Sequence, residues 1–96
     1  MKSFLLTVST PDGNVFDGAC VKMDVRAAGG ELAVMAGHIP MVTSVVSGDC
    51  TITLEDGTIL DAQLNGGILS VDTVKTTLVA GSFSFLVEDE RNQFVQ

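Results

Sequence analysis

The chain has 96 residues, of which 46% are hydrophobic, it contains neither Trp nor Tyr, and its formal net charge is −7. This length allows one domain with one core, built mainly from Val, Leu, Ile and Ala, a composition that favours strands. The negative charge argues against nucleic acid or anionic lipid as partners, and the apolar run within residues 1–8 is too short for a signal peptide or a membrane span, so we expect a cytoplasmic protein.

The first predicted strands show alternating apolar side chains. Residues 4–8 form one strand, a turn follows at 10–14, where proline and glycine favour a reversal, and residues 15–18 form a short return strand. The clearest strand covers residues 21–27. Its inward face would be Val21, Met23, Val25 and Ala27, and its outward face Lys22, Asp24 and Arg26. One solvated face is typical of an antiparallel sheet.

The stretch from residue 29 to residue 42 combines a strand with strong turn signals. Gly29 and Gly30 permit a turn, and residues 32–36 alternate as a short strand would. Pro40 then ends that strand, because proline has no amide donor and restricts the residue before it. Glu31 and His38 should therefore lie near opposite ends of this strand.

Two further strands are predicted on either side of the Glu55–Gly57 turn, after an apolar run over 41–46. A two-residue turn would place Ile52 opposite Asp61 and so put a carboxylate on the buried face. A three-residue loop with a left-handed Gly57 instead pairs Ile52 with Leu60 and keeps the apolar faces together. We therefore predict the three-residue loop.

The C-terminal half is also predicted to consist of strands separated by turns. Gly66 and Gly67 precede a strand at 68–71, where a glycine pair marks a bulge or a close approach of another backbone, and residues 74–80 form the next strand. Turn signals recur about every eight to twelve residues, which is typical of an all-β sandwich or barrel. Residues 86–96 are charged and polar, and they indicate either the first turns of a helix or a frayed tail.

Candidate catalytic groups are few. His38 is the only imidazole, and Cys20 and Cys50 are thirty residues apart without the spacing of a zinc site. We expect two reduced thiols in or near the sheet, no metal and no cofactor, because phosphate-binding and dinucleotide motifs are also missing. The chemistry alone indicates an acidic β domain that binds a partner.

Two glycine-bounded motifs carry a resemblance to a known family. They are Gly30-Glu31-Leu32-Ala33-Val34-Met35-Ala36-Gly37-His38-Ile39-Pro40-Met41 and, further on, Gly66-Gly67-Ile68-Leu69-Ser70-Val71. Together with the N-terminal strand and residues 15–18, they resemble the epsilon subunit of bacterial F-type ATP synthase, whose runs are G-E-L-G-I-x-P-G-H-A-P-L and G-G-I-L-E-V. The resemblance covers about residues 3–81.

The resemblance implies a flattened antiparallel β-sandwich of about ten strands over residues 1–84, with a short polar C-terminal tail at 85–96. It implies a non-catalytic central-stalk subunit on the cytoplasmic face of the bacterial cell membrane, coupling the gamma subunit to the c-ring without entering lipid and meeting the alpha/beta head only indirectly. The implied c-ring contacts are Thr10 and Glu31, and the implied gamma contacts are His38, Met41, Val42 and Thr43.

Glu31 and His38 each have a second, simpler interpretation that involves no partner. Glu31 suits a partner because c-ring loops of the family commonly carry arginine, yet an exposed rim carboxylate that contributes little is the alternative. His38 could contact gamma or only hydrogen-bond within its turn.

The family's C-terminal helical hairpin has only a weak echo in this chain, at Glu88 and Arg91. We therefore expect neither ATP binding nor inhibition by an extended arm. Two other functions remain open on the residues alone. One is a free-standing β-sandwich that binds a small ligand or peptide, and the other is a cysteine hydrolase that uses His38.

Overall fold

The computed structural model describes residues 2–86, which form ten strands and no helix. The strands are β1 (Phe4–Thr10), β2 (Gly13–Cys20), β3 (Lys22–Ala27), β4 (Gly30–Val34), β5 (Met41–Val45), β6 (Gly48–Thr53), β7 (Ile59–Leu64), β8 (Gly67–Val71), β9 (Lys75–Ala80) and β10 (Phe83–Phe85). The described part of the chain thus has no helix that could cross a bilayer.

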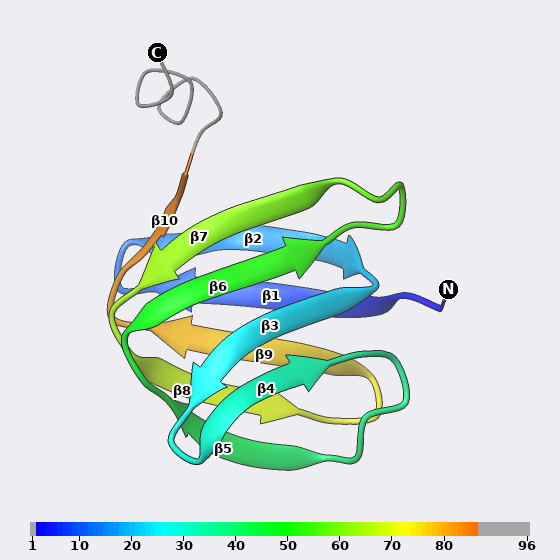
Figure 1. The fold of residues 1–96 in the computed structure, drawn as a ribbon, viewed down its shortest axis with the longest axis horizontal. Helices are drawn as coiled ribbons and strands as arrows, with labels where there is room; N and C mark the ends of the chain where they lie inside the picture. Colours follow the sequence, from blue (N-terminus) through cyan, green and yellow to red (C-terminus); the bar gives the residue numbers. More distant parts are fainter. Residues whose placement is uncertain (1, 87–96) are drawn as a thin grey trace.

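The strands belong to one sheet that folds over on itself into two layers. Its order is β10-β7-β6-β3-β5-β8-β9-β1-β2, with β4 paired to β3. In Figure 1, β7, β6, β3 and β4 form a front layer, and β2, β1, β9 and β8 lie behind it. The layers join where β3 meets β5 at Ala27 and Val45, and at the opposite edge the ring centroids of Phe16 and Phe85 are 6.4 Å apart. This confirms the predicted all-β sandwich of ten strands.

One strand pairing differs from a purely antiparallel sheet. The first strand, β1, pairs in parallel with β9, for example Leu6 with Thr76 and Val8 with Leu78, whereas all the other pairings among the described strands are antiparallel. Local turn signals could not reveal this pair, because its partners lie about seventy residues apart. The sheet is therefore mixed.

The core lies between the two layers and follows the alternation of the sequence. Leu6 and Val8 of β1 are fully buried and Leu5 beside them is exposed, as the predicted face requires. On β3, Met23 and Val25 point inward, and Leu69 and Leu78 meet them from the back layer. Thr76 is the only polar residue buried among those described. Burial of these aliphatic side chains stabilises the fold by about 1.5–3 kcal/mol for each large one.

The loop between β6 and β7 confirms the predicted register. Ile52 pairs with Leu60 and Cys50 with Ala62. The amide of Leu54 donates to the carbonyl of Thr58 at 2.8 Å, and Gly57 adopts a φ of +91°, a conformation that a side chain would strain. The odd-numbered loop therefore keeps Asp61 away from the core.

Gly67, at the start of β8, lies against another backbone. A β-carbon placed there would be 2.1 Å from the carbonyl oxygen of Val79 and 2.9 Å from Cα of Ala80. These two residues belong to β9, the neighbouring strand, in which Ala80 pairs with Gly67. The expected close approach is thus confirmed, and the position admits only glycine.

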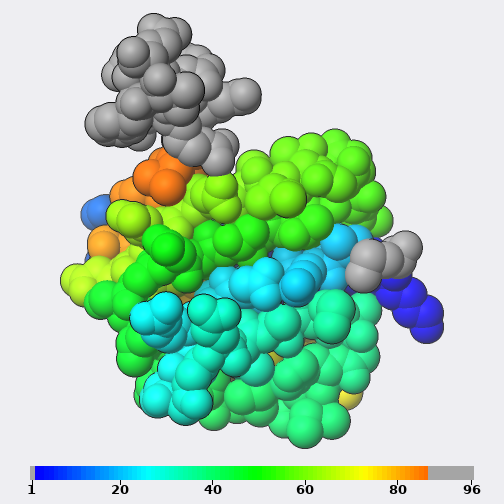
Figure 2. Space-filling model, viewed as in Figure 1, coloured from blue at the N-terminus to red at the C-terminus, as the bar shows by residue number. Residues whose placement is uncertain are grey.

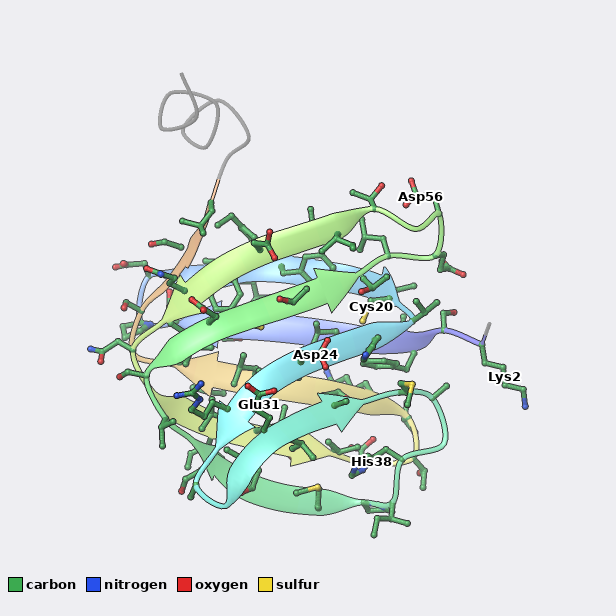
Figure 3. The ribbon with its side chains drawn as sticks, viewed as in Figure 1. Lys2, Cys20, Asp24, Glu31, His38 and Asp56 are labelled. Carbon is green, nitrogen blue, oxygen red and sulfur yellow. The ribbon has the colours of Figure 1, made fainter. Side chains whose placement is uncertain are left out.

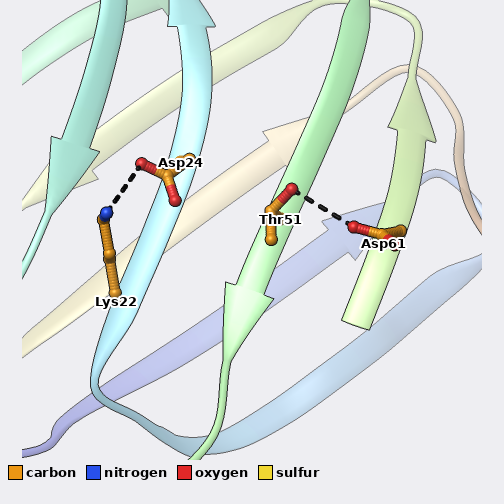
Figure 4. Close-up of polar contacts among 4 residues, drawn as sticks. All are labelled: Lys22, Asp24, Thr51 and Asp61. Atoms are coloured by element: carbon orange, nitrogen blue, oxygen red, sulfur yellow. Dashed lines mark hydrogen bonds and ion pairs between the residues drawn. The ribbon is translucent and has the colours of Figure 1, made fainter. Parts of the chain in front are cut away.

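The outer side of the front layer is polar. Figure 2 shows the side chains of β3, β4, β6 and β7 covering this face. Lys22 and Asp24 of β3 form an ion pair at 3.7 Å, and the hydroxyl of Thr51 on β6 donates to Asp61 on β7 at 3.4 Å (Figure 4). Alternation along the strands therefore places charge and hydroxyl groups in water, as the sequence predicted for β3.

Candidate partner-binding surfaces

The candidate contact residues lie at two ends of the molecule. The turns after β1 and β3 lie at one end, on the left in Figure 1, and the loop between β4 and β5 lies at the other. Figure 3 shows Glu31 and His38 toward opposite ends of β4. The sandwich thus separates the residues assigned to the c-ring from His38, as their place around one short strand predicted.

At the first end, the side chain of Thr10 forms hydrogen bonds within its own turn. Its hydroxyl accepts a hydrogen bond from the amide of Asp12 at 3.2 Å and donates to the carbonyl of Gly13 at 3.3 Å. Glu31 projects further, since its side chain is 84% exposed, and its carboxylate lies 3.8 Å from the guanidinium of Arg26. Of the two residues assigned to the c-ring, Glu31 is therefore the one whose side chain a partner can reach, and Thr10 shapes the turn.

At the other end, the strand stops earlier than the sequence indicated. We predicted a strand as far as Ala36, but β4 ends at Val34. The amide of His38 donates to the carbonyl of Met35 at 3.1 Å, and Gly37 takes a φ of +87°, so Ala36 lies within a turn rather than in the strand. The ring Nδ1 of His38 lies 2.8 Å from the carbonyl of Ile39, which supports a role within the turn.

A hollow of about 390 Å³ lies beside this loop, between residues 35–40, the β8–β9 turn and the N-terminal segment. The turn on its far side is fixed by Asp72, whose carboxylate accepts hydrogen bonds from the amides of Val74 and Lys75, each at 2.7 Å. These hydrogen bonds lower the pKa of Asp72. Ile39 and Val74, both strongly exposed, lie at the hollow, so its lining is partly apolar.

The outer side of the back layer carries exposed aliphatic side chains. We call Leu5, Val42, Ile68 and Val79 the aliphatic face. Ile68 is directly opposite Val79, and Ser70 lies opposite Val42, so hydroxyl groups separate the aliphatic ones. Because apolar side chains in water are stabilised when a partner covers them, this is the surface of the described chain best suited to an extended protein contact.

The four residues assigned to gamma do not share one face. Val42 is 71% exposed and belongs to the aliphatic face, and His38 is exposed in the loop before it. Met41 and Thr43 pair with the inward-facing Val71 and Leu69, and both are half-buried. Sequence reasoning missed Ile68 and Val79, although the alternation of 68–71 and 74–80 already placed them opposite the buried Leu69 and Leu78.

Comparison with known proteins gives these surfaces a context. A family profile described as the ATP synthase delta/epsilon chain β-sandwich domain matches residues 3–85. The chain belongs to this family. The chain is also 38% identical over 80 residues to the ATP synthase epsilon chain of Priestia megaterium, an alignment that covers 83% of this chain. It spans about three fifths of the length of that relative, because the alignment covers 59% of it.

Two solved structures have the same fold as this delta/epsilon-type chain. A chain of the Euglena gracilis mitochondrial ATP synthase, from a structure of OSCP, F1 and c-ring, aligns with a TM-score of 0.83 at 20% identity, covering 97% of this chain and 61% of that one. A chain from the central stalk and c-ring of the Tetrahymena thermophila enzyme aligns with a TM-score of 0.69 at 12% identity, covering 85% and 66%. At these identities the likeness concerns the fold.

The two thiols of this delta/epsilon-type chain are reduced and buried, as predicted. Burial raises the pKa of Cys20 to about 11 and that of Cys50 to about 12. A nucleophilic cysteine needs a depressed pKa and an accessible thiolate. The cysteine-hydrolase hypothesis is therefore wrong for the described residues, and within this part of the chain no cluster of side chains could hold a metal ion.

The thiol pKa values predict a loss of stability in alkaline solution. Well below pH 9 both folded and unfolded chains hold their thiol protons, so the cysteines add no pH dependence there. Between pH 9 and about 11 the unfolded chain releases protons that the folded chain retains, so stability should fall. Urea unfolding measured at about pH 8, 9 and 10 checks this, with a Cys20→Ala/Cys50→Ala variant as the control. An equally steep fall in the control would contradict the assignment to the thiols.

Proposed function

We propose that this chain is a non-catalytic subunit of the central stalk of an F-type ATP synthase, held between the gamma subunit and the c-ring on the cytoplasmic face of a bacterial membrane. The observation that carries the proposal is the combination of family membership with the placement of Glu31 and His38, the candidate contact residues, at opposite ends of one sandwich. In this role the domain transmits torque during ion-driven ATP synthesis and meets the alpha/beta head only indirectly.

In this proposal the aliphatic face and the His38 loop contact gamma. Lys75 lies beside Leu5, but the residues paired across the strands with Val42 and Ile68 are uncharged, and Val42 joins the aliphatic face to the loop. Interface cores are depleted in charged residues, which suits such a face. Met41 and Thr43 would support this contact from the inner side by fixing the position of β5.

The end that contains Thr10 and Glu31 faces the c-ring in this proposal. Glu31 offers an exposed carboxylate to a cationic group of a ring loop, and such a pair strengthens when the interface excludes water. Thr10 holds the adjacent turn in shape through its two hydrogen bonds.

Co-purification tests the assembly. The chain, expressed with the gamma subunit and c-ring of its own organism, should elute with both in detergent. A chain that elutes alone when gamma and the ring are folded would contradict the proposal. The tagged double variant Thr10→Ala/Glu31→Ala should still elute with gamma but no longer with the c-ring.

Replacing Glu31 by lysine should weaken binding to the c-ring at least about tenfold, because the new ammonium group repels the cation that the carboxylate attracted. Thermal unfolding should change little, since an exposed ion pair contributes only about 0–1 kcal/mol. Ring binding measured by biolayer interferometry, together with the melting curve, separates the two effects. Equal losses of ring binding and of stability would contradict the interface role.

We also propose a division of the chain at residue 84. Residues 1–84 form the sandwich domain and residues 85–96 correspond to the start of the family's helical hairpin, with Phe85 still joined to the sandwich as the last residue of β10, where it pairs with Ala62. The tail beyond residue 86, with Glu88 and Arg91, lies outside the described residues. We propose no nucleotide site there.

A further inference from the structure

Glu31 forms an ion pair with Arg26 of the same chain, and this pair has to break before the carboxylate can bind another cation. Arg26 of β3 lies directly opposite Glu31 of β4, because the two-residue turn at 28–29 sets this register. The guanidinium Nη2 and the carboxylate Oε1 are 3.8 Å apart, and both side chains are largely exposed. Such a pair is weak, since water screens it and both long side chains lose freedom when they form it.

The surroundings of Arg26 offer the guanidinium other carboxylates. β3 pairs with β6 only from Lys22 to Asp24, and beyond that point it turns to β5 at Ala27. A hollow of about 160 Å³ opens there, lined by Asp24 and Asp49 together with Arg26 and Glu31. Figure 3 shows Asp24 and Glu31 on the same side of the front layer. Arg26 thus shares this hollow with two further carboxylates, Asp24, which pairs with Lys22, and Asp49, which accepts a hydrogen bond from Gln63.

We propose that Arg26 is a built-in competitor for the Glu31 contact. In the free chain Arg26 neutralises Glu31, and when a cationic group of the partner arrives, Glu31 exchanges Arg26 for that group while the guanidinium remains beside Asp24 and Asp49. Arg26 is thus a positioning residue that lowers the affinity of the end bearing Glu31 and makes the contact easy to exchange. This inference rests on the proposed function, because it takes the c-ring as the partner.

The chain provides a matched control for the test. Lys22 lies on the same strand as Arg26, carries the same charge and forms its ion pair with Asp24, at 3.7 Å, rather than with Glu31. Arg26→Gln and Lys22→Gln therefore remove the same charge from the same strand. Only the first removes the partner of Glu31.

The experiment measures binding of the gamma-bound chain to purified c-ring in nanodiscs, at low and at high salt. Arg26→Gln should tighten binding about two- to fivefold at low salt, which is the range expected for the loss of one exposed ion pair. Lys22→Gln should change it by less. In a Glu31→Gln background, which itself should bind more weakly, Arg26→Gln should have no effect, and all variants should melt within a few degrees of the parent.

Three results would refute the proposal that Arg26 competes for Glu31. Two of them are weaker ring binding by Arg26→Gln and a tightening of ring binding that persists when the Glu31 carboxylate is absent. Unchanged ring binding by Glu31→Gln, when the parent does bind the ring, would overturn it as well and would leave the gamma contact standing. A parent that binds neither gamma nor the ring would instead refute the proposed function.

Discussion

Replacing Gly67 by valine should destabilise the fold by about 3 kcal/mol or more, at the upper end of the range for overpacked positions. The first atom of the new side chain would be 2.1 Å from the carbonyl oxygen of Val79, which is backbone and cannot rotate away. β8 and β9 would have to separate where Gly67 pairs with Ala80. For a domain of this size the melting temperature should fall by roughly 12 °C or more, as measured by calorimetry.

Gly29 is the matched control for this substitution. It lies in the turn between β3 and β4, a β-carbon at this position would meet no atom within 4 Å, and its φ is not in the left-handed region. Gly29→Ala should therefore leave stability unchanged or raise it by about 0.4–1 kcal/mol, because alanine restricts the unfolded chain. A Gly67→Val variant that melts like the parent would show that the two backbones are further apart than the structure has them.

Replacing Val42 by aspartate should weaken binding to the gamma subunit by about thirtyfold or more, the loss that corresponds to an interface position worth about 2 kcal/mol. The carboxylate would sit in the middle of the proposed contact and lose its water there without a partner. Because Val42 is 71% exposed in the free chain, the substitution should have little effect on the stability of the fold. Titration calorimetry with purified gamma measures the change.

Ile59 supplies the control for the aliphatic face. It is 56% exposed, similar to the members of that face, but it lies on β7 in the front layer. Ile59→Asp adds the same charge at an exposed aliphatic position and should change gamma binding by less than about threefold, which falls within the usual range for surface changes. If Ile59→Asp weakened binding as much as Val42→Asp, the contact would not be confined to the back layer.

The strands and their faces could be predicted because alternation is a local signal. Leu6 and Val8 against Leu5, and Met23 and Val25 against the charges of β3, are separated by single residues, so burial of one face fixes the pattern. The β6–β7 register followed from the same rule, since the alternative loop buried Asp61. These elements needed no knowledge of distant parts of the chain.

The contacts between distant segments could not be predicted in this way. The parallel pair of β1 and β9, the hollow beside the His38 loop and the junction of β3 with β5 all depend on how the layers fold together. The Arg26–Glu31 pair is different. A two-residue turn at 28–29 would have predicted it from the sequence, because residues flanking such a turn pair across it.

The pairing of the first strand with the ninth also governs how the chain can fold. β1 lies between β2, which follows it at once, and β9, which begins at Lys75. During synthesis the β1–β2 hairpin can form early, but its other edge stays open until nearly the whole sandwich has left the ribosome. Closing a loop of this length costs conformational entropy, so this small domain should fold in milliseconds to seconds. Until β9 pairs with β1, the open edge of the N-terminal hairpin can pair with other strands instead.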